Sequence, residues 1–270
     1  MIHREGRIIE LVADTGHSAL GEISPLPGVS EEGPEEVNRE ISGLRSAVMA
    51  DDLPEDIDLP TEGCERWLRP LKSSPAVRFG LETAVLGLIA AKKGVPLCRL
   101  ISETPRAEVS INALLAGPSE AILSEIPGLR SKGYGTFKLK VGGRPLEEVV
   151  RLSVAVRERI GAAAVLRLDA NRAWHVDQAL EVSRSLSHID IDYIEEPVRT
   201  QDMLNDLLSI PDLPIPVALD ESLSKAEPDG MTFSPHIGAL VLKPTLLGLE
   251  RTLRLAECAA GHGVKAVISS

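Results

Sequence analysis

The sequence has few cysteines, no excess of positive charge and no long hydrophobic run. Cys64, Cys98 and Cys258 are its three cysteines, and none belongs to a C-x-x-C pair, so we expect reduced, buried thiols. The longest apolar run, Ala84 to Ala91, is far too short to cross a bilayer, and no hydrophobic leader follows Met1. These absences predict a cytoplasmic protein that does not act at a membrane.

The charge balance narrows the class of partner. A net charge of −11 and a pI near 5.1 argue against nucleic acid, because binding a phosphate backbone requires a basic face. A small anionic substrate is compatible with this balance if a local cation offsets the charge. With 270 residues, 43% hydrophobic and 26% charged, the chain is typical of a globular protein with one large domain or two.

The first third of the chain mixes strand and helix signals. Residues 7 to 13 and 17 to 23 predict a β-hairpin, followed by a loop stiffened by Pro25. Helical periodicity runs from Glu35 to Met49 and from Pro75 to Lys93. These pieces predict an α+β domain at residues 1–105.

From residue 106 onward the pattern changes to short apolar strands that alternate with amphipathic helices, which predicts a parallel (β/α) barrel. The predicted strands are Val109 to Ala116, Thr136 to Val141, Val165 to Asp169, Ile191 to Glu195, Ile215 to Asp220, Ile237 to Lys243 and Val264 to Ser269. The clearest predicted helices are Leu146 to Ile160, Val176 to Leu186 and Leu249 to Ala260. A closed barrel needs about eight strands, so we expect a barrel domain at 106–270 that is incomplete at its C-terminal end.

The strand Thr136 to Val141 carries an unusual pair of lysines. Alternation places Lys138 and Lys140 on one face of the strand, and the apolar residues between them on the other. If the apolar face packs under helices, both amines point into the barrel, where burial and mutual repulsion would favour the neutral, proton-accepting form. The alternative is a solvated edge strand.

Acidic residues follow three later strands. Asp169, Glu195 and Asp220 end the runs VLRLD, IDYIE and PVALD, at the strand ends where barrel enzymes hold their active sites. Three converging carboxylates form a hard-oxygen site that suits Mg²⁺, with Mn²⁺ as a possible substitute. None of the six histidines has metal-ligand spacing. The alternative for a single acid is a helix N-cap, since aspartate is a favoured capping residue.

A third lysine completes the series. Lys243 follows a strand that lies beyond the three carboxylate strands, so it should face Lys140 across the metal. This arrangement suits removal of a proton next to a carboxylate, with the cation holding the substrate carboxylate and a neutral lysine taking the proton.

The motifs GEISPLPG, KLK, LDANRAW, IEEP, ALDES, LKPTLLG and VISS, taken together, resemble those of the enolase superfamily in its muconate-lactonising branch. Within that branch they look most like the o-succinylbenzoate synthases. The lysine and magnesium chemistry of enolase-type sites follows the scheme above. The resemblance implies a Mg²⁺-dependent lyase that removes an α-proton and then water from a cyclohexadiene carboxylate, in menaquinone or phylloquinone biosynthesis.

The resemblance also implies individual roles. Asp169, Glu195 and Asp220 would bind Mg²⁺, with Glu195 preferred over the adjacent Glu196. Lys140 would be the acid and base, and Lys243 would stabilise the intermediate from the opposite face. The residues that would contact the substrate or lie beside it are Lys138, Arg167, Asn171, Pro25, Ser269 and Ser270.

Two questions stay open at this level. The same two lysines would serve an N-acylamino acid racemase or a dipeptide epimerase, and a non-enzymatic barrel serving as a scaffold is a third possibility. Members of the branch begin with a strand ahead of the one at Arg7 and continue past VISS through an eighth strand. We therefore expect this sequence to be part of a longer chain, with residues 1–105 forming a capping domain.

Overall fold

The computed structural model describes residues 4–48 and 63–269 and contains two compact units. The first comprises Met1–Ala107, Leu242–Cys258 and Ile268–Ser270, and the second comprises Glu108–Val241 and Ala259–Val267. The predicted helix end at Met49 and the predicted contact residue Ser270 lie outside the described residues. The prediction of two contiguous domains, 1–105 and 106–270, stays a prediction. Among the described residues, no helix is both long and apolar enough to cross a membrane.

The first unit contains the predicted hairpin. Strands β1 (Arg7–Val12) and β2 (Ser18–Ile23) pair antiparallel, and helix α3 (Pro75–Lys93) packs against them. The backbones approach closely, since a Cβ atom on Gly21 would lie 1.9 Å from the Gly80 carbonyl oxygen. Glycine at both positions therefore sets the distance between the hairpin and the helix.

Local sequence explains where α3 begins and ends. Pro75 occupies the first turn, where its missing N–H costs nothing, and Glu32 accepts a 2.8 Å hydrogen bond from the Ala76 N–H. At the other end, Gly94 adopts a left-handed conformation with φ of 67° and donates to the Ala91 carbonyl. The predicted bounds of this helix are confirmed.

The remaining helices whose residues lie wholly or mainly in this unit are shorter. They are α1 (Pro34–Val48), α2 (Gly63–Leu68), the 3₁₀ helix η1 (Arg69–Leu71), α4 (Leu97–Ile101), α9 (Pro244–Leu247) and α10 (Leu249–Gly261). The prediction for α10 is confirmed to within one residue at its end. Its first turn follows Gly248 directly, and α9 packs on α3.

A curved sheet of seven strands in the order β3-β4-β5-β6-β7-β8-β9 confirms the predicted barrel-type fold. Register pairing is parallel from β3 through β8. The strands are β3 (Asn112–Leu115), β4 (Thr136–Lys140), β5 (Val165–Asp169), β6 (Tyr193–Glu195), β7 (Val217–Leu219), β8 (Ile237–Leu242) and β9 (Lys265–Ile268). The main difference from prediction is length, because Val109 and Ile111 are exposed and lie outside β3.

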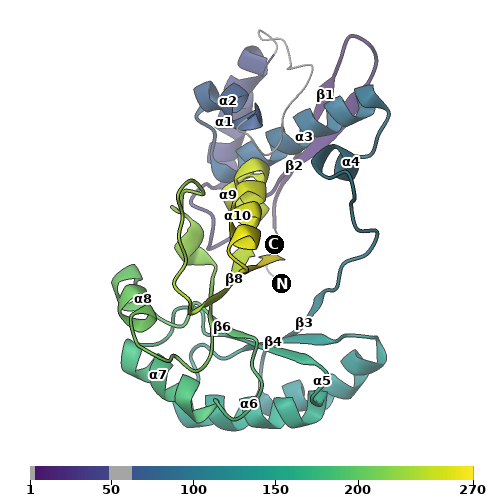
Figure 1. Cartoon of the computed structure of the whole chain (residues 1–270). Coiled ribbons are helices and arrows are strands. Elements are labelled where there is room, and N and C mark those ends of the chain that lie inside the picture. Colours follow the sequence, from purple (N-terminus) through teal and green to yellow (C-terminus); the bar gives the residue numbers. More distant parts are fainter. Residues whose placement is uncertain (1–3, 49–62, 270) are drawn as a thin grey trace. The chain divides into compact units, whose positions relative to one another are not determined.

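Helices of the second unit cover one face of this sheet (Figure 1). They are α5 (Ser119–Ser131), α6 (Leu146–Ile160), α7 (Val176–Ser185) and α8 (Gln201–Leu208). Phe137, Leu139 and Val141 are fully buried, whereas Lys138 and Lys140, between them in sequence, keep partial exposure. The predicted alternation along β4 is therefore confirmed. The short 3₁₀ helix η2 (Glu221–Leu223) follows β7.

Candidate active site

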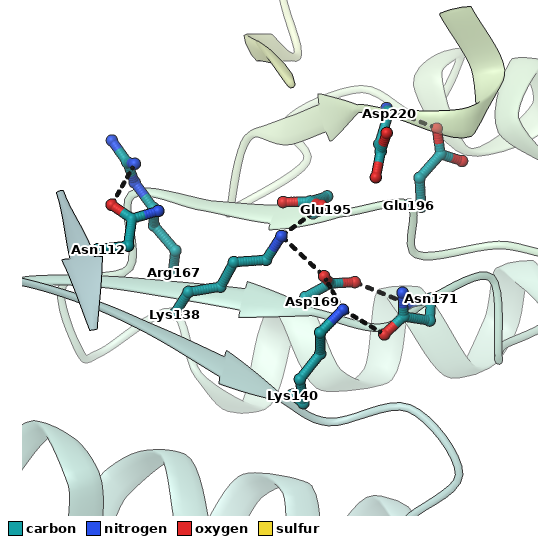
Figure 2. A network of polar contacts seen from close by, with 9 residues as sticks. All are labelled: Asn112, Lys138, Lys140, Arg167, Asp169, Asn171, Glu195, Glu196 and Asp220. Atoms are coloured by element: carbon teal, nitrogen blue, oxygen red, sulfur yellow. Dashed lines mark hydrogen bonds and ion pairs between the residues drawn. The ribbon is translucent and has the colours of Figure 1, made fainter. Parts of the chain in front are cut away.

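Strand β4 directs both of its lysines toward acids on the neighbouring strands (Figure 2). The Lys138 ammonium lies 2.6 Å from Glu195 Oε1 and 2.9 Å from Asp169 Oδ2. The Lys140 ammonium lies 2.6 Å from Asp169 Oδ2 and 2.9 Å from Asn171 Oδ1. The register explains this meeting, because Lys140, Asp169 and Glu195 are successive partners across β4, β5 and β6.

The electrostatics of Lys138 differ from the sequence-based expectation. Burial by itself would lower the pKa of this amine, but the carboxylates of Glu195 and Asp169 outweigh burial and raise the pKa above its ordinary value. The expectation that Lys138 would be driven toward its neutral form is therefore wrong. The expectation considered only burial and repulsion between the two lysines, whereas the carboxylates of Glu195 and Asp169 lie in direct contact with the Lys138 amine. These contacts therefore favour the positively charged form of Lys138.

Glu195 carries the clearest sign of excess negative charge. Burial, followed by repulsion from Asp169, raises its pKa to about 8, and Asp220 adds to the effect. Its Oε2 atom is buried and has no hydrogen-bond partner among the described residues. Burial alone would also raise the pKa of Asp169, but the ammonium groups of Lys138 and Lys140 outweigh burial and lower this pKa. The site therefore favours additional positive charge near Glu195.

The predicted role of Asp169, Glu195 and Asp220 as ligands of one metal ion stays a prediction. Among the residues that this structure describes, no three His, Cys, Asp or Glu side chains are arranged to hold one ion. Instead, the Lys138 ammonium bridges Asp169 and Glu195. The donor chemistry nevertheless fits a divalent cation, because the acids supply oxygen ligands and Glu195 Oε2 is a buried oxygen with no hydrogen-bond partner in the described part of the chain. Figure 2 shows the Asp220 carboxylate directed toward Glu195.

The loop after β5 places the side-chain amide of Asn171 against the Lys140 amine. Asn171 and Arg172 both adopt left-handed backbone conformations, with φ of 47° and 58°. The Asn171 N–H donates to Asp169 Oδ1 over 3.0 Å, while its side-chain oxygen accepts from Lys140. Asn171 and Lys140 are therefore in direct contact, and the role of Asn171 toward substrate stays a prediction.

Glu196 lies apart from its neighbour Glu195. A left-handed backbone at Glu196, with φ of 40°, sends its carboxylate toward the turn after β7, where it accepts from the main-chain N–H of Asp220 over 2.8 Å. Sequence reasoning considered Glu196 only as an alternative metal ligand and missed this contact. The doubled acid in IEEP is the signal that could have raised the question, since consecutive residues point in different directions.

Arg167 belongs to a different polar cluster, at the opposite ends of the strands. Its guanidinium donates to Asp192 Oδ2 over 2.9 Å and to Asn112 Oδ1 over 3.0 Å, and it lies 4.9 Å from the centre of the Tyr193 ring. Lys265 also pairs with Asp192. In Figure 2 the Arg167 side chain points away from the Lys138 amine. Its predicted contact with substrate stays a prediction, and sequence reasoning missed its two partners.

The other predicted site residues lie in the first unit. Lys243 directly follows β8 and precedes α9, and its predicted place opposite Lys140 stays a prediction. Pro25 lies in the loop after β2, where the next residue, Leu26, accepts hydrogen bonds from Val29 and Ser30. The Ser269 N–H donates to the Leu242 carbonyl over 2.8 Å. The roles of Pro25 and Ser269 toward substrate also stay predictions.

Comparison with known proteins identifies the family. Residues 122–270 match the family model described as "Enolase C-terminal domain-like". The chain belongs to the enolase superfamily. Its similarity to o-succinylbenzoate synthases places it in the muconate-lactonising branch. The o-succinylbenzoate synthase of Aliivibrio fischeri is 30% identical over 276 residues, which cover 99% of this chain and 74% of that protein.

Other relatives span a wider range of activities. The Arabidopsis thaliana "Protein PHYLLO, chloroplastic" is 31% identical over 294 residues, which are 99% of this chain and 17% of that protein. The "Hydrophobic dipeptide epimerase" of Roseobacter litoralis is 31% identical over 200 residues, which are 72% of this chain and 57% of that protein. This chain therefore spans only part of either relative.

A solved structure supports the same grouping. MenC from Desulfotalea psychrophila superimposes with a TM-score of 0.81 at 25% identity, over 99% of this chain and 81% of that one. The fold and the enolase-superfamily membership are thus established for this chain, and they define a class of enzymes with lyase and isomerase relatives.

Proposed function

We propose that this chain carries the catalytic residues of a Mg²⁺-dependent o-succinylbenzoate synthase-type lyase. The observation that carries the proposal is the set of contacts at the ends of β4, β5 and β6, where two lysines meet two buried acids. The similarity to o-succinylbenzoate synthases along nearly the whole chain supports this choice of substrate, a cyclohexadiene carboxylate with a succinyl side chain. Menaquinone or phylloquinone biosynthesis is the proposed setting.

Lys140 is the proposed acid and base. Its amine, held by Asp169 and Asn171, takes the proton from the carbon next to the substrate carboxylate. The electron pair of that C–H bond forms the new double bond as the C–O bond on the neighbouring carbon breaks. The Lys140 ammonium then returns its proton to the departing hydroxide, which leaves as water from the same face. The proton and the hydroxide leave together as water, so the reaction needs no further reactant.

Lys138 is the proposed partner of the substrate carboxylate. Its raised pKa favours the positively charged form, and its side chain is 14% exposed. Asp169, Glu195 and Asp220 would hold Mg²⁺, and the bound ion would supply positive charge that stabilises the negative charge developing on the substrate. Lys243 is proposed to stabilise the same charge from the opposite face.

The competing proposal is racemisation of N-acylamino acids or epimerisation of dipeptides. It is favoured by the identity of 31% to a dipeptide epimerase, which equals or exceeds that to the synthases. Both reactions begin with removal of a proton next to a carbonyl group, so the lysines alone do not distinguish them. The synthase match covers 99% of this chain, whereas the epimerase match covers 72%, and we therefore favour the synthase.

The test compares both reactions on one preparation of the protein. With Mg²⁺ present, the cyclohexadiene acid should lose water, with a change in its ultraviolet absorbance. Incubation of N-succinyl amino acids and hydrophobic dipeptides in D₂O, followed by proton NMR, should show much slower exchange at the α-carbon. Faster turnover of either of these substrates would overturn the choice of the synthase and favour the racemase or epimerase.

Lys140→Ala isolates the proposed base. Loss of the amine should reduce turnover by at least about a thousandfold, as expected for a general base that acts in each step, with an unchanged circular dichroism spectrum. Lys132→Ala removes an exposed lysine at the end of α5 and is the matched control, with an expected wild-type rate. A Lys140→Ala enzyme that keeps more than a few per cent of the wild-type rate would remove Lys140 from this role.

A further inference from the structure

Glu196 accepts hydrogen bonds from four donors while almost completely buried. Its Oε1 atom accepts from the main-chain N–H groups of Asp220 and Ser222, each over 2.8 Å. Its Oε2 atom accepts from the Ser222 hydroxyl over 2.9 Å and from Arg172 Nε over 3.0 Å. Only 2% of the residue is exposed. Both oxygens are therefore committed to protein donors.

These donors come from the ends of the strands that carry the three acids. Arg172 follows β5, Glu196 follows β6, and Asp220 and Ser222 follow β7. Arg172 donates two further hydrogen bonds. Its main-chain N–H donates to the Glu196 carbonyl over 2.7 Å, and its Nη2 donates to the Ser222 hydroxyl over 3.0 Å. A single side chain thus links three neighbouring loops.

Glu196 also holds the main chain around Asp220. Asp220 follows β7 with φ of −129° and ψ of −88°, immediately before η2. The hydrogen bonds from the Asp220 and Ser222 N–H groups to one oxygen hold the peptide group before Asp220 and the peptide group before Ser222. The direction of the Asp220 side chain follows from that fixed backbone.

We propose that Glu196 is a positioning residue that sets the Asp220 carboxylate toward Glu195 by holding the Asp220 main chain (Figure 2). The proposal rests on the proposed function in one respect, because it takes Asp220 as a cation ligand. The Glu196 side chain is long enough to accept a hydrogen bond from the Asp220 N–H, and this contact holds the main chain. The negative charge of Glu196 matters mainly for its contact with Arg172. Cation binding by Asp220 therefore depends more on the length of the side chain at position 196 than on its charge.

Three substitutions separate reach from charge. Glu196→Gln keeps the length and an oxygen that can accept from the Asp220 and Ser222 N–H groups. Glu196→Asp keeps the charge but is one methylene shorter, and Glu196→Ala removes both. Affinity for Mn²⁺ alone, measured by electron paramagnetic resonance and calorimetry on the full chain, should fall about tenfold or more in Glu196→Asp and Glu196→Ala. In Glu196→Gln it should stay within about threefold of wild type.

A double substitution tests whether the effect passes through Asp220. Combining Glu196→Ala with Asp220→Ala should cost no more Mn²⁺ affinity than Asp220→Ala alone, because the two residues act as one unit. Glu148→Ala is the matched control, since Glu148 also bridges two elements by accepting from Ser119 and Arg144, neither of which belongs to the candidate site. It should lower the melting temperature slightly and keep wild-type Mn²⁺ affinity.

The outcomes distinguish this proposal from the proposed function. If the wild-type chain binds Mn²⁺ and Glu196→Asp binds it equally well, the positioning role is overturned while the cation site stands. Equal losses in Glu196→Gln and Glu196→Ala would also overturn it, because charge and not reach would then decide. If the wild-type chain binds no Mn²⁺, the cation premise of both proposals fails. Should Glu196→Ala not fold, the Glu196→Asp and Glu196→Gln pair gives the same decision.

Discussion

A buried acid in the first unit gives a sharp test of how the fold responds to pH. Glu82 on α3 is 1% exposed, and burial raises its pKa to about 7 from an ordinary value of 4.5. Its carboxylate accepts hydrogen bonds from the N–H groups of Leu249 and Glu250 in the first turn of α10. The two hydrogen bonds and the charge of Arg78 lower the pKa of Glu82, whereas the nearby Glu250 raises it further. Burial outweighs the hydrogen bonds and Arg78, so the pKa is raised overall.

The sign of the effect on stability follows from proton binding. Between about pH 4.5 and 7 the folded protein holds a proton on Glu82 that the unfolded chain has released, so stability falls as pH rises through this window. The shift from 4.5 to about 7 is worth about 3 kcal/mol once Glu82 is ionised in both the folded and the unfolded state, and most of that change falls between pH 5 and 8. Glu82→Gln keeps an oxygen acceptor for α10 and removes the titration.

The assay must observe the first unit. Of the two tryptophans in the chain, Trp67 packs on the core of the first unit, whereas Trp174 lies in the second. In a Trp174→Phe background, urea unfolding followed by fluorescence therefore reports the first unit. Relative to the same background without the Glu82 change, the stability of Glu82→Gln should rise by roughly 2 to 3 kcal/mol as the pH is raised from 5 to 8.

A second buried acid serves as the control for this experiment. Glu32→Gln alters a carboxylate that accepts from the Ala76 N–H at the start of α3, and this variant should keep the pH dependence of its background because Glu82 is still present. An unchanged pH dependence in Glu82→Gln would refute the reasoning. A gain in stability that is equal at every pH would do so as well, because it would show that the side chain acts through packing and not through its ionisation.

Three further predictions concern single positions. Gly21→Ala places a Cβ 1.9 Å from a carbonyl oxygen of α3, so we expect a loss of more than about 3 kcal/mol in urea unfolding, and a loss below about 1 kcal/mol would contradict that contact. Gly142→Ala places a Cβ 2.5 Å from the Ala170 carbonyl and should lower turnover at least about tenfold by moving the loop that holds Asn171. Lys138→Met removes a charge that lowers the pKa of Glu195, so this pKa should rise above about 8 in an infrared titration of its carboxyl group.

The strand and helix pattern could be predicted from sequence because it is local. The bounds of α3, α6 and β5 follow from apolar periodicity and from Pro and Gly at the ends. The strands predicted at the positions of β6 and β7 were too long. Hydrogen-bonded pairing with both neighbouring strands decides where a strand begins and ends, whereas the apolar pattern continues into residues outside the strand.

The candidate site was predictable in its members and not in its contacts. Parallel strands bring their C-terminal ends to one edge, so the positions of Lys140, Asp169 and Glu195 along three successive strands were enough to group them. The protonation of Lys138 was mispredicted because a pKa depends on the nearest charges in space. The partners of Arg167, Asn112 and Asp192, come from separate parts of the chain and gave no local signal.

The sequence by itself determined that strands and helices alternate and that lysines and acids end the strands, because those properties depend only on residues within a few positions of one another. Tertiary structure alone decided that the Lys138 ammonium lies between Asp169 and Glu195, and that Glu196 turns away to hold the main chain of Asp220. These are differences of a few ångströms between neighbouring strands. Such distances set the charge of each group, and hence the chemistry available to it.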